Sequence, residues 1–168
     1  FDVTLAANFT KTDVVNIFIP QKSRLEDISP DKIFSEQDIS IIEEWQPENR
    51  ISLSTLYKKE NWTMNLTLNR YGEYTIMDGG RQTYGAELIT DLRINYQFND
   101  KFSFNFGSNN LFDVMPDENK IGNSRAGTIE DGSGNIIVSS PGVFTYSRRS
   151  APFGFNGVYY YAGVNYSF

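Results

Sequence analysis

Residues 156–168 read NGVYYYAGVNYSF, and this closing stretch decides the fold class of the chain. Apolar residues occupy every second position, and small, amide or tyrosine side chains stand between them. The alternating sets are Val158, Tyr160, Ala162, Val164, Tyr166 and Phe168 on one side, and Gly157, Tyr159, Tyr161, Gly163, Asn165 and Ser167 on the other. A period of two predicts a β-strand. A strand of about ten residues with one apolar and one polar face is the unit of outer-membrane barrels.

Five earlier stretches show the same alternation. The predicted strands cover residues 1–11, 50–58, 61–73, 83–98 and a stretch that begins at Phe102. Short turns join the second strand to the third and the fourth to the fifth, whereas residues 12–49 and 114–155 form the longest connections. Short turns at one end of a sheet and long loops at the other are typical of an outer-membrane barrel. We therefore predict an all-β fold, an antiparallel transmembrane β-barrel segment of about six strands with long extracellular loops.

Composition removes several classes of function. The chain of 168 residues contains no His and no Cys, so the usual general base, the commonest metal ligand and thiolate chemistry are missing. We predict that the protein is not an enzyme and that it holds no cofactor and no metal. The net charge of −6 argues against nucleic acid as a partner. A transmembrane helix is excluded as well, because it requires about 18 or more consecutive apolar residues.

Two other interpretations of the fold stay open at this point. The first is a soluble sandwich or ligand-binding barrel, whose strands also alternate apolar and polar residues, although soluble strands average only about five or six residues. The second is a small outer-membrane barrel that acts as an adhesin or enzyme. Single-chain membrane barrels begin at about eight strands, because an unpaired strand edge in hydrocarbon is costly. Since Phe1 already lies in a strand pattern with no signal sequence before it, we expect the mature or cut C-terminal piece of a larger barrel.

Three motifs near the C-terminus resemble one protein family. They are residues 109–113, which read NNLFD with Pro116 close behind, residues 152–157, which read PFGFNG, and a terminal pattern of Tyr161, Gly163, Tyr166 and Phe168. In order and spacing they resemble the C-terminal barrel region of TonB-dependent outer-membrane receptors. The resemblance is specific over the fifth and sixth strands and less specific over the hairpin at residues 46–72.

The resemblance implies a location and a function. Residues 1–168 would belong to a barrel of about 22 strands around a plug domain, in the outer membrane of a Gram-negative bacterium. Such a receptor takes up a scarce nutrient, most often a ferric siderophore, with a carbohydrate or another organic compound as the second class of cargo.

The resemblance also implies partners. They are the rest of the barrel and its plug, outer-membrane lipid and lipopolysaccharide, and the barrel-assembly machinery. That machinery would recognise the terminal signal made by Tyr161, Gly163, Tyr166 and Phe168. The plug and the energy-coupling segment are missing from this sequence, so TonB would be contacted only through the missing N-terminal part.

Candidate ligand-binding residues lie in the last long loop. Arg148 and Arg149, with Tyr146 close by, combine guanidinium groups with an aromatic ring. These groups suit an anionic or planar ligand. Lipopolysaccharide phosphates and salt bridges within the loops are the alternative partners for the two arginines.

Three further clusters have structural interpretations. Glu87, Asp91 and Arg93 share the polar side of the fourth strand, and we expect them to form an ion network. Ser35 and Asp38 predict a capping box for a short helix. That helix would present Ile39, Ile42 and Trp45 on a common face. Residues 131–135 begin like a calcium loop but lack its later glycine and glutamate, so we predict a hairpin tip.

Overall fold

A computed structural model gives the fold and describes residues 1–19, 29–120, 126–130, 132–143, 145–147 and 149–168. Its main element is a six-stranded antiparallel sheet in the order β1-β2-β3-β6-β7-β10. The strands are β1 (Asp2–Phe9), β2 (Asn49–Lys59), β3 (Trp62–Tyr71), β6 (Glu87–Asn99), β7 (Phe102–Asn109) and β10 (Tyr159–Tyr166). The prediction of six antiparallel strands is confirmed. The sheet is open, because within the described ranges β1 and β10 form its two edges and do not pair.

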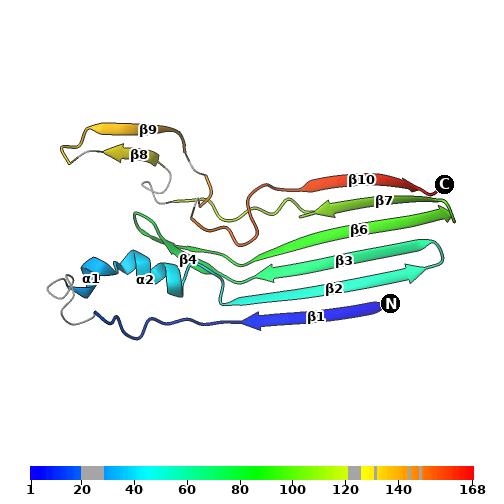
Figure 1. Ribbon diagram of the computed structural model, residues 1–168, viewed down its shortest axis with the longest axis horizontal. Helices are drawn as coiled ribbons and strands as arrows, with labels where there is room; N and C mark the ends of the chain where they lie inside the picture. Colours follow the sequence, from blue (N-terminus) through cyan, green and yellow to red (C-terminus); the bar gives the residue numbers. More distant parts are fainter. Residues whose placement is uncertain (20–28, 121–125, 131, 144, 148) are drawn as a thin grey trace.

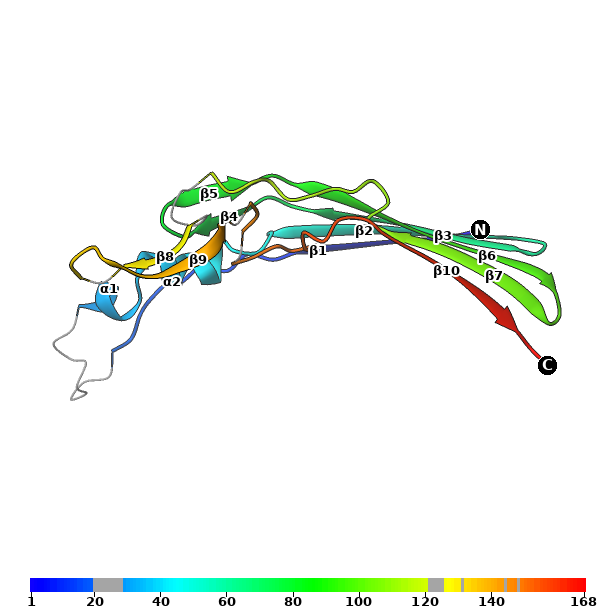
Figure 2. The same cartoon turned by 90° about the horizontal axis from the view of Figure 1, so that it is seen from above.

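All the long connections leave the same end of the sheet. In Figure 1 the two short turns and both chain termini lie at the right-hand end, and the long connections extend from the left-hand end. Viewed from above, the sheet is one curved layer with the loops gathered beyond that end (Figure 2). We call the two ends the short-turn end and the loop end.

The long connections contain small elements of their own. They are α1 (Pro30–Ile33) and α2 (Glu36–Glu43), the hairpin of β4 (Tyr74–Met77) with β5 (Arg81–Tyr84), and the hairpin of β8 (Ala126–Glu130) with β9 (Ile136–Val143). The β8-β9 pairing confirms the predicted hairpin, although Asp131 at its tip lies outside the described residues. No helix in the described part of the chain is long and apolar enough to cross a membrane.

The capping box at the start of α2 is confirmed. The Ser35 side chain accepts a hydrogen bond from the Asp38 N–H, and the Asp38 carboxylate accepts one from the Ser35 N–H. The expected common apolar face is wrong. Trp45 is 8% exposed, but Ile42 is 48% exposed. The two side chains differ because α2 ends at Glu43, so Trp45 follows the helix and packs among the loops.

Two predicted strand starts differ from the structure by more than one residue, and in both cases a loop contact explains the difference. The fourth strand was expected from residue 83, but residues 83 and 84 belong to β5, and β6 begins at Glu87. Between them, the Gly85 N–H donates to Asp117 Oδ2 at 2.7 Å rather than to a neighbouring strand. The last strand begins at Tyr159, because Gly157 has a φ of 75° and the Val158 N–H donates to Asp113 Oδ1 at 2.9 Å.

The strand register gives the sheet two different faces. Residues paired directly across antiparallel strands lie on the same face. The apolar face carries mainly Val3, Leu5, Ala7, Phe9, Ile51, Leu53, Tyr57, Trp62, Met64, Leu66, Leu68, Leu88, Leu92, Ile94, Tyr96, Phe102, Phe104, Phe106, Tyr160, Ala162, Val164 and Tyr166. The polar face carries mainly Thr4, Asn8, Ser52, Ser54, Thr63, Asn65, Thr67, Asn69, Asp91, Arg93, Asn95, Asn105, Asn109, Tyr159, Tyr161 and Asn165.

The buried apolar cluster lies in the loops, and among the described residues Ile89 on β6, 7% exposed, is buried apart from it. Trp45, Tyr74, Ile76 and Tyr84 form a buried cluster beyond the loop end. They come from the segment after α2 and from the β4-β5 hairpin. This loop-end cluster therefore joins two long connections into one packed unit.

Candidate functional site

The apolar face of the sheet is uncovered in this chain. Leu5, Val164 and Trp62 are 69%, 60% and 46% exposed, although they stand on three different strands. The chain exposes 11703 Å² in all. A compact monomer of its mass, 19.2 kDa, exposes about 8,400 Å² from the usual scaling of surface with mass. Contiguous exposed apolar surface of this extent marks a face that contacts another molecule or a membrane.

Aromatic rings form a row across the apolar face at the short-turn end. The ring centroids lie 4.5 Å apart for Trp62–Tyr96, 4.6 Å for Tyr96–Phe98, 5.1 Å for Phe98–Phe102 and 5.2 Å for Tyr166–Phe168. Tyr166 is paired directly with Phe102, so the row continues from β3 to β10. Rows of this kind occur where membrane strands meet the water interface.

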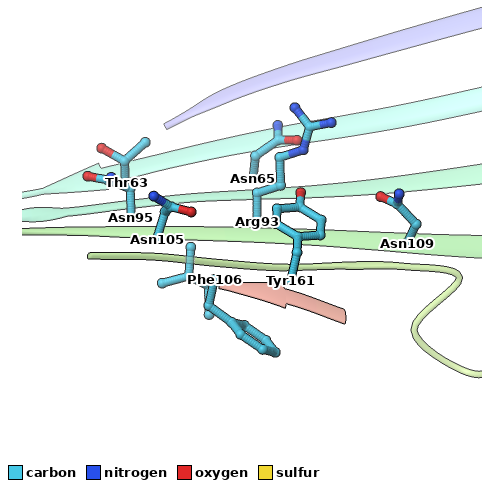
Figure 3. Close-up of a pocket in the computed structure, with 9 residues that line it drawn as sticks. Thr63, Asn65, Arg93, Asn95, Asn105, Phe106, Asn109 and Tyr161 are labelled. Carbon is cyan, nitrogen blue, oxygen red and sulfur yellow. The ribbon is translucent and has the colours of Figure 1, made fainter. Parts of the chain in front are cut away.

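The polar face has a hollow at the middle of the sheet, which we call the mid-sheet hollow. Its volume is about 610 Å³, and its polar lining consists of Thr63, Asn65, Arg93, Asn95, Asn105, Asn109 and Tyr161. In Figure 3 the side chains of Arg93 and Tyr161 rise on the same side of the sheet, whereas Phe106 points to the other side. The lining is rich in amides that both donate and accept hydrogen bonds.

The ion network expected on this face is wrong. Among the described residues, neither Glu87 nor Asp91 forms an ion pair with Arg93. Asp91 Oδ1 instead accepts a hydrogen bond from the Asn110 N–H at 2.9 Å. The Asp91 carboxylate thus fixes the chain where β7 ends, and the exposed Arg93 guanidinium stays available to a partner.

A second hollow lies at the loop end of the polar face, and we call it the loop-end hollow. Its volume is about 320 Å³. The strands contribute Asn69 and Tyr71 from β3, Ile89 and Asp91 from β6, Asn109 from β7 and Tyr159 from β10, and the wall is completed by Asn110, Phe153, Gly154, Asn156 and Gly157. Residues from four strands and from both ends of the connection between β7 and β10 therefore surround a single small space.

The loops around this hollow are joined to one another. The Thr75 N–H donates to the Glu44 carbonyl at 3.0 Å, and Ser150 Oγ donates to the Trp45 carbonyl at 2.9 Å. Gln82 Nε2 donates to the Glu118 carbonyl at 2.8 Å. The three long connections thus hold one another through hydrogen bonds to backbone carbonyls, which do not depend on a ligand.

The structure places Arg149 in an ion pair between two loops. Its Nε and a terminal nitrogen donate to the two carboxylate oxygens of Asp78 at 3.1 and 3.2 Å. This two-point contact corresponds to the loop salt bridge that was one alternative for the arginines. The Tyr146 ring stacks on Phe155 with centroids 6.0 Å apart. Arg148 lies outside the described residues.

The terminal pattern makes a close contact with β7. Tyr161 is paired with Gly107, and its ring lies across the backbone there so closely that a Cβ at position 107 would overlap it. A Cβ on Gly163 would come within 2.9 Å of Asn105 Oδ1. Tyr166 and Phe168 pack edge to face. Sequence reasoning singled out Tyr161 and Gly163 but missed Gly107, whose only sequence signal is a glycine inside a strand pattern.

The tyrosines and the aspartate with shifted pKa values in the loops take part in packing and helix capping. Burial raises the pKa of Tyr74 and of Tyr84 above the ordinary 10.0, so both phenols stay neutral. Their rings stack with centroids 5.0 Å apart. The Tyr84 hydroxyl donates to Asn119 Oδ1, whereas the Tyr74 hydroxyl is buried with no hydrogen-bond partner among the described residues. In the capping box, the hydrogen bond from the Ser35 side chain lowers the pKa of Asp38.

These surfaces offer three kinds of contact, namely an apolar face for a nonpolar environment, a polar face with two hollows, and an ordered set of loops. No protein-family model matches the chain, and a search of the curated proteins finds no match.

Proposed function

We propose that this chain forms part of the wall and external loops of an outer-membrane receptor that takes up a scarce nutrient. The observation that carries the proposal is the apolar face, which extends over all six strands and stays exposed. Hydrocarbon covers such a face, and the polar face then lines a water-filled interior.

The dimensions of three interior strands support a membrane location. β2, β3 and β6 have 11, 10 and 13 residues, whereas β1, β7 and β10 have 8 each, and a tilted transmembrane strand needs about 9 to 11. The aromatic row then lies at one membrane interface, and the short turns lie on the periplasmic side. The two free edges, β1 and β10, pair with the remaining strands of the barrel.

The polar face and the loops support the receptor part of the proposal. The amides of the polar face, and Arg93, which has no ion-pair partner among the described residues, face the space that a plug domain fills in the family that the C-terminal motifs resemble. A ferric siderophore, or a carbohydrate or other organic compound, is the cargo that this resemblance suggests. Ordered loops at one end suit capture of such a cargo from outside the cell.

A pair of arginine substitutions on neighbouring residues tests the membrane orientation. Leu66 and Thr67 are adjacent on β3 and point to opposite faces. In the intact protein folded into phosphatidylcholine vesicles, Leu66→Arg should lower the free energy of unfolding by about 2 to 4 kcal/mol, because the charge would lie in hydrocarbon. Thr67→Arg should cost far less, because it faces water.

Denaturant titration with tryptophan fluorescence measures both values. Equal losses for the two variants, or a larger loss for Thr67→Arg, would refute the assignment of lipid to the apolar face. A soluble, monomeric protein that folds without any detergent or lipid would refute it as well.

A further inference from the structure

The loop-end hollow combines aromatic rings with unused amides. Tyr71 and Phe153 contribute rings whose centroids are 5.4 Å apart at an angle of 44°. Tyr159 on β10 is 62% exposed and also lines the hollow. An exposed ring beside a hollow offers a flat apolar platform to a ligand.

The amides in this hollow keep their hydrogen-bonding capacity. Among the described residues, the side chains of Asn69 and Asn109 have no hydrogen-bond partner. Each amide provides two donors and an acceptor. One oxygen of the Asp91 carboxylate is also unoccupied, since only Oδ1 accepts from Asn110. A ligand that both donates and accepts at closely spaced positions satisfies these groups.

The charge around the hollow disfavours an anionic ligand. Among the described residues, its lining contains the Asp91 carboxylate and no Lys or Arg. The arginines of the described loop end already have partners, because Arg149 pairs with Asp78 and Arg81 pairs with Glu44 at 2.9 Å. The Arg50 guanidinium lies over the Tyr71 ring, 4.7 Å from its centroid. An anion in the hollow would be repelled by the Asp91 carboxylate, which belongs to its lining.

We infer that the loop-end hollow binds a neutral, hydroxyl-rich ligand, one or two sugar units of an oligosaccharide being the closest fit. The C–H face of a sugar ring packs on Tyr159 and Phe153, and its hydroxyls exchange hydrogen bonds with Asn69, Asn109 and Asp91. The volume of about 320 Å³ is at the small end of ligand pockets and accommodates part of a longer chain. This inference rests on the proposed receptor function and names its cargo class.

Tyr159 and Tyr160 provide a matched pair for the test. The two side chains are 62% and 55% exposed, and they point to the polar and the apolar face respectively. The intact receptor in detergent is probed with an array of neutral and anionic oligosaccharides and with ferric tris-catecholate. Titration calorimetry then measures the affinity for the best probe in Tyr159→Ala, Tyr160→Ala and Tyr159→Phe.

The expected result is binding of a neutral oligosaccharide that weakens about tenfold in Tyr159→Ala, because a stacking platform is lost. Tyr160→Ala should bind like the parent, and Tyr159→Phe should retain most of the affinity. Asn109→Ala should weaken binding as well, and it leaves the rings in place.

Several results would overturn the inference. They are binding of the ferric chelate or anionic sugars alone, no binding of any neutral oligosaccharide, or equal affinities in Tyr159→Ala and Tyr160→Ala. The last result also follows if another part of the receptor fills the hollow. The Leu66→Arg and Thr67→Arg comparison needs no ligand, so a failure of the receptor proposal is recognised separately from a failure of this cargo assignment.

Discussion

Replacing Trp45 tests whether the loop end is a folded unit that is independent of the sheet. Trp45 is 8% exposed and packs in the cluster with Tyr74, Ile76 and Tyr84. Its indole N–H donates to Ser40 Oγ at 2.9 Å, and Ser40 is 2% exposed. Two substitutions separate the contribution of ring packing from that of the hydrogen bond. Trp45→Phe keeps a ring in the cluster but loses the indole N–H, whereas Trp45→Ala removes both.

The structure sets the size of the expected effects. Trp45→Ala should cost about 3 to 5 kcal/mol of local stability, the usual loss when a buried tryptophan is truncated and a cavity remains. Trp45→Phe loses the hydrogen bond to Ser40, which is worth about 1 kcal/mol, and part of the ring volume. Ser40 Oγ still donates to the Gln37 carbonyl at 2.8 Å, so its hydroxyl is not left unpaired. We expect about 1 to 2 kcal/mol for this variant.

Amide hydrogen exchange read by mass spectrometry measures these losses segment by segment. A loss of about 3 to 5 kcal/mol corresponds to exchange faster by a factor on the order of 100 to 4,000, at about 1.4 kcal/mol for each factor of ten. The increase should appear in peptides that contain α2 and the β4-β5 hairpin, because these elements form and surround the cluster. Peptides from β2 and β3 should exchange as in the parent protein.

Two outcomes would refute the reasoning. Unchanged exchange in α2 and β4 would mean that the cluster does not hold the loops together. Equal acceleration in the strands and the loops would mean that the sheet depends on the loop core, contrary to their separation in space (Figure 2).

Two further predictions concern the titratable groups of the loops. Tyr74→Phe removes a hydroxyl that is buried without a partner, so it should leave stability unchanged or slightly raised, whereas Tyr84→Phe breaks the bond to Asn119 and should cost about 1 kcal/mol. Thermal unfolding of the two variants compares them, and a larger loss for Tyr74→Phe contradicts the assignment. For Asp38, the folded pKa lies below the ordinary 3.8, so the capping contribution is present above pH 3.8 and is lost as the pH falls through the lowered value. NMR titration of the carboxyl should show this pKa rising toward 3.8 in Ser35→Ala, and an unchanged pKa would show that the Ser35 side chain is not its cause.

The strands were predictable because each of them carries its own alternation. The period of two in the sequence is set by the two faces of the sheet, so the signal is local to each strand. The capping box of Ser35 and Asp38 is likewise contained within four neighbouring residues. Such local features can be predicted without knowing which residues contact them in the folded protein.

The boundary errors came from contacts between distant residues. The alternation runs on from Thr83 into β6, and nothing in that stretch alone reveals that Asp117 binds the Gly85 N–H. Gly107 was missed for the same reason, because its importance depends on the register that places Tyr161 over it. The pairing of Arg149 with Asp78 also joins separate loops. A pattern along the chain predicts helices and strands, but contacts between residues distant in sequence become visible only in the folded structure.

The position of the core gives the strongest physical argument about function. In a protein that folds by itself in water, large apolar side chains leave the solvent, but here the described buried cluster is confined to the loops. Leu5, Phe9 and Val164 stay 69%, 73% and 60% exposed on the sheet. In the proposed receptor, a nonpolar environment outside this chain stabilises that arrangement. A soluble partner would need a matching apolar surface along all six strands, whereas a bilayer supplies one with no specific contacts.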